Sequence, residues 1–317
     1  MTIAIGLLAG AIAIAVFGPL YLRLLLHPRV APGIALAGWV TSPLVAVASA
    51  IAGATLLLIP NNASVDGTIG MAKSCVNVVH GQAAAWEHLF RLAGAALVTI
   101  AVLRVLVVTV SQVRKDAALR RRHLTAVRLL SREDPDSRVL WLDQDQPVAY
   151  SVGGRRGAIV ATTGVQRLDA EAREAVLAHE RAHLSGRHHA LVLIVTALAK
   201  ALPFVPLFRA ATPAVRVLVE LSADASASQR CGPRSVRAAL RAVTADAVPA
   251  TSLAMSGEST RLRLHWLGSS APGGRLRARC AAAAIASASP AVLAVGVVAC
   301  LVLLYCFSAT AVAGTYP

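Results

Sequence analysis

The segment that decides the fold lies in the middle of the chain. Residues 168–183 read LDAEAREAVLAHERAH. Asp169 is a suitable N-cap and good helix formers follow it, so we expect a helix over this segment. The helix contains the pattern HExxH. Because residues four apart lie on one face of a helix, His179 and His183 would present both imidazoles to one metal ion.

The glutamate inside this pattern indicates a reaction. Imidazoles are ordinary ligands of Zn²⁺, and HExxH on a helix is the zinc-binding pattern of many metalloproteases. Glu180 adjoins the first histidine and can act as the general base on a water molecule at the metal. The pattern therefore predicts a zinc metalloendopeptidase with Glu180 as its catalytic residue. The alternative is a solvated helix face with incidental histidines.

A catalytic zinc site needs a third protein ligand, and Glu220 is the first candidate. It stands four residues before Asp224, in an ExxxD pattern on a second expected helix. Glu220 would complete a His, His, Glu ligand set, and Asp224 would accept the free N–H of a ligand histidine. Residues 190–228 contain no other acidic side chain, which favours a functional pair over an incidental one.

The second candidate is His189. It completes the longer pattern HExxHxxGxxH, with Gly186 at the glycine position. Proteases with that pattern normally face the outside of the cell and need a methionine turn, for which Met255 is the only downstream methionine. Ligand type and topology therefore favour Glu220, and His189 stays the alternative.

Long apolar runs lie on both sides of the HExxH segment. The chain has 317 residues, of which 56% are hydrophobic, yet its net charge is +15. This composition excludes a disordered chain and indicates a polytopic membrane protein with a basic aqueous part. Four runs reach the roughly 20 residues that a membrane-spanning helix needs. They are residues 2–26, 34–59, 92–113 and 281–313.

The basic residues indicate the orientation of these spans. They are dense after the third run, over residues 114–138, and again at residues 275–279, but sparse in the loop 61–91. The positive-inside rule then puts residues 114–279 in the cytoplasm. We expect a multi-pass protein of the cell membrane whose active site faces the cytoplasm. Since the charge has this topological explanation and no recognition motif is evident, direct nucleic-acid binding is not expected.

The order of these features resembles a known family. Membrane helices, a cytoplasmic segment, HExxH and then ExxxD occur in this order in the BlaR/MecR-type membrane zinc peptidases, the antirepressor family. The chain is similar, more distantly, to the membrane CAAX-protease and heat-shock membrane protease group. The resemblance covers roughly residues 90–280. It implies a membrane-embedded zinc endopeptidase that cleaves a cytoplasmic transcriptional repressor in a regulatory pathway.

Two further segments carry the resemblance, and one position departs from it. Residues 157–164, GAIVATTG, resemble the family's edge strand, against which a substrate strand would pair. Residues 260–264, TRLRL, resemble its arginine-rich segment after the second metal helix. The departure is His188, where relatives commonly carry an aspartate.

The resemblance does not extend to the sensor. Antirepressors of this type often carry an extracellular penicillin-binding domain with an SxxK serine. In this chain the positions three before each lysine hold other residues, namely Gly70, Gln112 and Ala197. We therefore expect no penicillin-binding sensor domain. The expected partners are the membrane and a protein substrate, with a repressor as the class that the resemblance implies.

Together these patterns predict a mainly α, polytopic membrane protein with about four transmembrane helices and a zincin-like α+β catalytic domain. We expect a membrane domain at 1–113 with three transmembrane helices, a cytoplasmic metallopeptidase domain at 114–280 and a C-terminal transmembrane helix at 281–317. Two other functions stay open. One is a protease for membrane-protein processing or quality control, and the other is a catalytically inactive membrane signalling scaffold.

One apolar stretch cannot be an ordinary span. Only 36 residues separate His183 from Glu220, which is too few for two crossings of a membrane, and a single crossing would separate the two ligands. Pro203 and Pro206 interrupt the stretch. We therefore expect a re-entrant or membrane-flush segment near residues 190–208.

Overall fold

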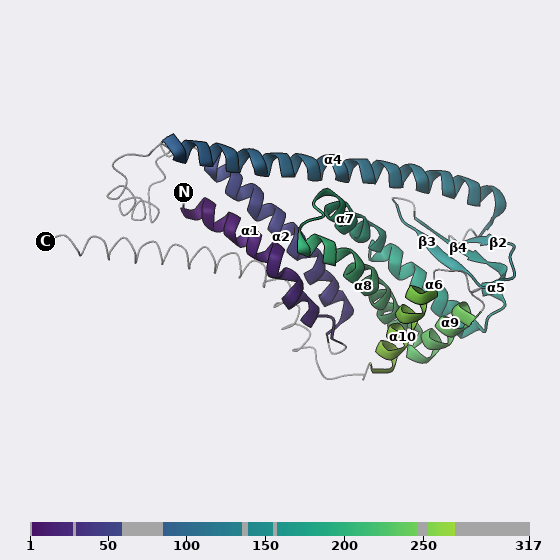
Figure 1. Ribbon diagram of the computed structural model, residues 1–317. Coiled ribbons are helices and arrows are strands. Elements are labelled where there is room, and N and C mark those ends of the chain that lie inside the picture. The colour runs from purple at the N-terminus through teal and green to yellow at the C-terminus, as the bar shows by residue number, and fades with distance from the viewer. Residues whose placement is uncertain are drawn as a thin grey trace.

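The structure is a computed structural model, and it describes residues 2–27, 30–58, 85–134, 139–154, 157–245 and 253–269. Long apolar helices form one end of the molecule and a smaller α+β part forms the other, as Figure 1 shows. Helix α4 (Ala85–Leu130), 46 residues long, extends along both parts. The protein is therefore mainly helical, as predicted, with a small sheet in the α+β part.

Three of the described helices are long and apolar enough to cross a membrane. They are α1 (Thr2–Leu24), α2 (Pro32–Leu58) and the part of α4 from Leu92 onward. Large apolar side chains such as Phe17 and Ile100 are exposed on these helices, as expected where helices face lipid. The fourth predicted span, at residues 281–313, lies outside the described residues.

A four-stranded sheet lies at the other end of the molecule. Its strands are β1 (Arg132–Glu133), β2 (Val139–Leu142), β3 (Ala149–Val152) and β4 (Ala158–Thr162), in the order β1-β2-β4-β3. Strand β4 pairs in parallel with β2 and antiparallel with β3. The last turns of α4 cover one face of the sheet through Val127, and Leu177 of the HExxH helix covers the other.

The prediction that residues 157–164 form an edge strand is wrong. Residues 157–164 contain β4, which is a central strand with every residue buried. The physical reason lies in its composition, because a continuous apolar run indicates a strand that is paired on both sides and covered on both faces. The strand at the edge next to β4 is β3.

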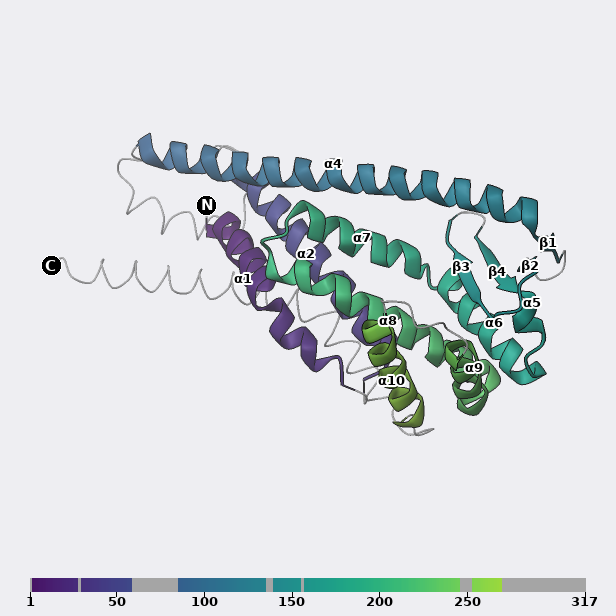
Figure 2. The same cartoon turned by 45° about the vertical axis from the view of Figure 1, so that its right-hand side comes forward.

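The HExxH helix, α6 (Ala170–Ser185), follows the sheet and a short helix α5 (Thr163–Gln166). A helical hairpin comes next, formed by α7 (His188–Ala201) and α8 (Pro206–Cys231) (Figure 2). The break between these two helices lies at residues 202–205, beside the prolines noted in the sequence. Helices α9 (Pro233–Ala245) and α10 (Leu253–Ser269) complete the described chain and pack against α8.

The tip of the α7–α8 hairpin lies among the apolar helices. Leu207, near the start of α8, packs so closely against Gly18 of α1 that a Cβ atom on that glycine would lie 3.0 Å from the leucine side chain. Arg104 of α4 donates a hydrogen bond to the carbonyl of Ala201 at the end of α7. The chain thus leaves α6, runs alongside the apolar helices, turns and comes back to α6.

Candidate active site

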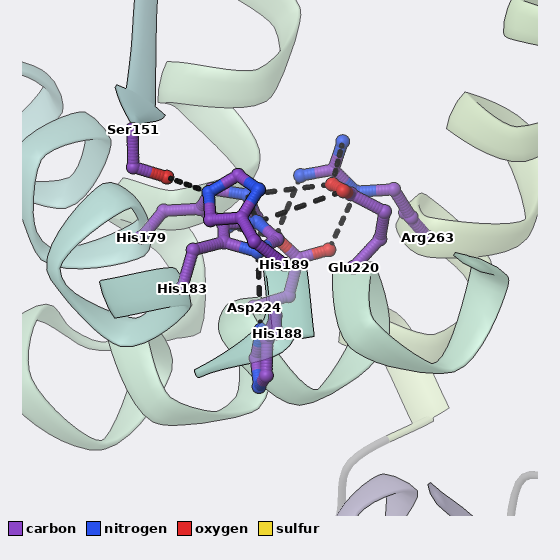
Figure 3. Close-up of polar contacts among 8 residues, drawn as sticks. All are labelled: Ser151, His179, His183, His188, His189, Glu220, Asp224 and Arg263. Atoms are coloured by element: carbon purple, nitrogen blue, oxygen red, sulfur yellow. Dashed lines mark hydrogen bonds and ion pairs between the residues drawn. The ribbon is translucent and has the colours of Figure 1, made fainter. Parts of the chain in front are cut away.

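Helices α6 and α8 bring three of the predicted site residues together (Figure 3). The Nε2 atoms of His179 and His183 lie 3.1 Å apart. Glu220 faces both of them, with Oε2 3.4 Å from Nε2 of His179 and Oε1 3.6 Å from Nε2 of His183. In the described part of the chain, these three residues are the one group of His, Cys, Asp and Glu side chains found with metal-binding geometry.

The separations of these atoms fit a tetrahedral zinc ion. Ligand atoms about 2.0–2.1 Å from a tetrahedral zinc lie roughly 3.3 Å from one another. The three observed separations, 3.1, 3.4 and 3.6 Å, are close to that value. Two imidazoles and one carboxylate are also a ligand set of catalytic zinc in peptidases. The residues present could therefore hold Zn²⁺ and leave its fourth position open.

His179 is supported by a pair of opposite charges. Nδ1 of His179 lies 2.9 Å from Oδ1 of the buried Asp224, a short ion-pair distance whose angle is not that of a good hydrogen bond. Arg263 of α10 holds Asp224 with two hydrogen bonds of 2.7 Å, donated by Nε and Nη2. Its third nitrogen, Nη1, lies 3.4 Å from Glu220. One guanidinium thus positions both carboxylates of the ExxxD pattern.

These charges decide the protonation of His179. Burial lowers its pKa, but the carboxylates of Asp224 and Glu220 more than offset this and raise the pKa to about 9. For Asp224 the causes run the other way. Burial raises its pKa, but Arg263 and His179 outweigh burial and bring the pKa down to about 2. Without metal, an imidazolium thus lies against a carboxylate.

His183 is supported by a neutral partner. Its Nδ1 lies 3.0 Å from Nδ1 of His188, and both residues are buried. One of these nitrogens carries the hydrogen and the other accepts it. Burial, in the absence of an adjoining carboxylate at Nδ1, lowers the pKa of His183 to about 4. His188 therefore supports His183 without adding a negative charge.

The small residue Gly186 makes room for His188. A Cβ atom at this position would come within 2.4 Å of Nε2 of His188. Gly186 has ordinary helical angles, with φ of −77°. The glycine is therefore explained by the space that the ring of His188 takes up and not by its backbone conformation.

His189, the other candidate ligand, faces a different way. Its Nε2 lies 3.2 Å from the hydroxyl of Ser151 on strand β3. The centroid of its ring is 6.2 Å from that of His183. The structure therefore brings Glu220, and not His189, to the two histidines of the HExxH pattern.

Glu180 lies beside the edge strand β3. Burial raises the pKa of this carboxyl group, and hydrogen bonding to the side chain and backbone of Ser151 offsets part of the rise. A raised pKa suits a group that must accept a proton and then return it. Ser151 carries no signal in the sequence that would have singled it out.

The edge of β3 turns backbone groups toward this site. The N–H of Thr162 bonds to the carbonyl of Val148, which makes those two residues a hydrogen-bonded pair. Because such pairs alternate along antiparallel strands, the N–H and C=O groups of Ala149 and Ser151 point away from β4. The backbone groups of Ala149 lie at this open edge, whereas those of Ser151 hydrogen-bond to Glu180 and His189.

Two cavities meet at the candidate metal centre. The larger, which we call the groove, has about 1170 Å³ and lies between α4, β3, α7 and α8. The smaller, which we call the α9 pocket, has about 240 Å³ and lies between α6, α8 and α9. Glu220 and Arg263 border both of them, so the candidate centre is open on two sides.

Comparison with known protein families identified a match for the middle of the chain. Residues 113–256 match Peptidase family M48, a family of zinc metallopeptidases, and the matched range contains the HExxH pattern and Glu220. Neither the curated proteins nor the solved structures gave a match. The family match points to a metalloprotease. The narrower resemblance to BlaR/MecR-type peptidases and the expected lack of a penicillin-binding sensor domain stay predictions.

Proposed function

We propose that the protein is a zinc endopeptidase embedded in the cell membrane, with its active site facing the cytoplasm. The observation that carries the proposal is the convergence of His179, His183 and Glu220, whose ligand atoms all lie within 4.8 Å of one another. The adjoining Glu180 and the M48 match support peptide hydrolysis as the reaction.

The side chains of the site have separable roles in this reaction. Zn²⁺ held by the three ligands would supply a Lewis acid for the scissile carbonyl and the attacking water. Glu180 would take a proton from the water and deliver it to the leaving amine. Strand β3 would align an extended substrate at its open edge, where the backbone groups of Ala149 lie. Arg263 would hold Glu220 and Asp224 in position.

The contacts of the α7–α8 hairpin support its placement inside the membrane. Gly18, which packs against Leu207, stands six residues before the end of α1, or roughly 9 Å along the helix. Arg104, the one charge in the apolar run of α4, is engaged by a carbonyl of the hairpin, as expected of a charge at membrane depth. A re-entrant hairpin would keep the two histidines on α6 and Glu220 on α8 on the same side of the membrane. The positive-inside rule favours the cytoplasmic side for them.

A soluble cytoplasmic repressor is the substrate that we propose first, on the resemblance to antirepressors. One observation favours membrane-protein processing or quality control as a second candidate. The groove continues from the metal centre along the hairpin, past Val192 and Thr196 of α7 and Thr212 of α8. A substrate segment entering from the membrane would follow this route.

Zinc content and proteolysis of purified variants test the proposed reaction. We expect about one zinc ion per wild-type chain and a loss of zinc in Glu220→Ala. Glu180→Gln should keep its zinc but lose activity by about 100-fold or more. Glu174→Gln is a matched control on the same helix, because Glu174 is 56% exposed. A wild-type chain that binds no zinc and cuts no protein would instead be an inactive scaffold.

The substrate class requires a comparison in cells. Proteins that accumulate with Glu180→Gln relative to the wild type are identified by mass spectrometry. A repressor-cleaving enzyme predicts one accumulating soluble protein. Many accumulating membrane proteins would support quality control instead.

A further inference from the structure

His189 completes the longer histidine pattern of the sequence but does not join the candidate metal ligands. Its ring packs against strand β3 instead. A Cβ atom on Gly153 would lie 2.7 Å from Cδ2 of His189, so the glycine leaves the space that the ring fills. Nε2 of His189 lies 3.2 Å from the hydroxyl oxygen of Ser151 (Figure 3). His189 therefore has a defined place beside β3 that metal binding does not explain.

The side chain of Ser151 faces helix α6. Alternate residues of a strand point to the same face of its sheet, and Ala149, two positions before Ser151, packs against the buried cluster that includes Leu177 of α6. Ala149 and Glu180 also border the same pocket. Only 8% of Ser151 is exposed, so its hydroxyl group needs hydrogen-bond partners within the protein. Glu180 and His189 supply them.

Ser151 contacts the catalytic glutamate through two donors. Its hydroxyl group and its backbone N–H both hydrogen-bond to the carboxylate of Glu180. The carboxylate accepts both hydrogens, because an ionised carboxyl group has none to donate. Two donors fixed on a paired strand restrict the rotation of the Glu180 side chain. The group that must take a proton from water and return it is thereby held in one orientation.

The single hydrogen of the Ser151 hydroxyl group determines what His189 must do. If the hydroxyl group donates this hydrogen to Glu180, its oxygen can only accept in the contact with His189. Nε2 of His189 must then carry a hydrogen and donate it to Ser151. The bond between His189 and the backbone of Ser151 favours the protonated imidazole, so the ring is the donor there as well.

We propose that Ser151 and His189 position Glu180 for proton transfer, through hydrogen bonds that run from His189 to Ser151 and from Ser151 to Glu180. Both are positioning residues, since they act on the reaction through Glu180. The inference rests on the proposed peptidase function and gives the last histidine of the HExxHxxGxxH pattern a role without contact with the metal. It also connects Glu180 to β3, the strand along which a substrate would lie.

Kinetics of the zinc-loaded, full-length protein in detergent micelles test the role of Ser151. The probe is the peptide that the wild type cuts fastest in a proteome digest, prepared by synthesis. We expect Ser151→Ala to lower kcat by about 10-fold with little change in KM, because a misplaced catalytic group slows the reaction without weakening binding. The loss should be smaller than that of Glu180→Gln, because the backbone N–H of Ser151 stays in place.

Two substitutions test the hydrogen that His189 donates. His189→Leu removes the donor and should lower kcat by about 10-fold. His189→Gln puts an amide N–H the same number of bonds from the backbone as Nε2, so it should restore most of the wild-type kcat. Ser151→Ala combined with His189→Leu should lose little more than Ser151→Ala alone, because the two residues act on Glu180 one through the other.

Two controls separate positioning from general damage to the protein. Ser185→Ala removes a hydroxyl group that bonds to the carbonyl of Ala182 at the end of α6. His265→Leu removes an exposed imidazole of α10. Both controls should keep the wild-type kcat. Zinc content and thermal unfolding are measured for every variant, and Ser151→Ala and His189→Leu should match the wild type in both.

The outcomes distinguish the inference from the function on which it rests. The inference is wrong if Ser151→Ala and His189→Leu keep the wild-type kcat, or if they lose activity only together with zinc. It is also wrong if His189→Gln is as slow as His189→Leu, or if the losses add in the double variant. In each of these cases the peptidase function stands. If the zinc-loaded wild type cuts no peptide of the digest, the proposed function fails and the inference fails with it.

Discussion

The two histidines of the HExxH pattern stand four residues apart on one helix, yet their supports differ. His179 rests against Asp224, which Arg263 holds with two hydrogen bonds of 2.7 Å. His183 rests against the neutral ring of His188. The pKa of His179 is raised to about 9 and that of His183 is lowered to about 4. The motif alone therefore does not set the properties of its ligands.

This difference indicates that the two sides contribute unequally to the metal centre. A carboxylate behind a ligand histidine makes the imidazole more basic and fixes its tautomer, and losing such a partner typically costs 10- to 100-fold in metal affinity or activity. A neutral imidazole can orient the ring but adds no charge. We therefore expect the partners of His179, Asp224 and Arg263, to contribute most to stability and zinc affinity. The partner of His183, His188, should contribute less to both.

The largest effect is expected for Asp224→Ala. Removing this buried carboxylate leaves the guanidinium of Arg263, among the described residues, with the longer contact to Glu220. Breaking a buried ion pair on one side costs about 3–5 kcal/mol of stability. Zinc affinity should fall toward the 100-fold end of the range for such partners. Thermal unfolding and competitive zinc titration measure both quantities. If Asp224→Ala lost less zinc affinity than His188→Ala, the expected order of the two ligand partners would be reversed.

Arg263→Lys should have the next largest effect. Lysine keeps the charge but cannot form the two parallel hydrogen bonds to Asp224, because its ammonium group is a single point of donation. We expect a decrease of about 10-fold in zinc affinity, less than for Asp224→Ala because the carboxylate stays in place. Arg261→Lys is the control, since Arg261 is exposed on the same helix. Equal zinc affinities for the two lysine variants would contradict the role of Arg263.

His188 variants should sharpen the comparison with smaller effects. His188→Ala removes the partner of His183 and should lower zinc affinity by about 10-fold, the low end for such partners. His188→Asp puts a carboxylate oxygen the same number of bonds from the backbone as Nδ1, so it should restore or exceed wild-type affinity. His188→Asn has the same reach without the charge and is the control. If Asp and Asn bind zinc equally, charge at this position does not matter.

The sequence predicts those site residues that lie close to each other along one helix. His179 and His183 share one helix, and the scarcity of acidic residues pointed to Glu220 and Asp224, which share another. Arg263 could not be selected in the same way. It stands 39 residues from Asp224, and Arg261, two positions earlier, lies on a different face of α10. Only the packing of α10 against α8 decides between the two arginines.

The sheet illustrates a different limit. Strands β3 and β4 are both short, and the segment containing β4 was predicted as the edge strand. Which of them lies at the edge depends on pairing with β2, which is a long-range contact. The uninterrupted apolar composition of β4 was the available signal for a central strand. The membrane helices, by contrast, follow from length and hydrophobicity alone, and three of the four predicted spans are confirmed as long apolar helices.

The smallest effect on zinc affinity is expected for Gly186→Ala, which alters neither His183 nor His188 itself. The new methyl group would overlap Nε2 of His188, so the ring must move away from its contact with His183. Zinc affinity should fall by less than the roughly 10-fold expected for His188→Ala, because a displaced ring can keep part of the contact. Gly268→Ala is the control, as a Cβ there would meet no atom within 4 Å.

A double variant shows whether the glycine acts only through His188. If it does, Gly186→Ala combined with His188→Ala should bind zinc as His188→Ala alone does, since the methyl group then has no ring to displace. Additive losses in the double variant would mean that the methyl group disturbs α6 itself, where the carbonyl of Ala182 lies 3.1 Å from the same position. In that case the position of His183 would depend on the backbone at the end of α6 as well as on His188. The comparison between His179 and His183 would then concern the helix end in addition to their side-chain partners.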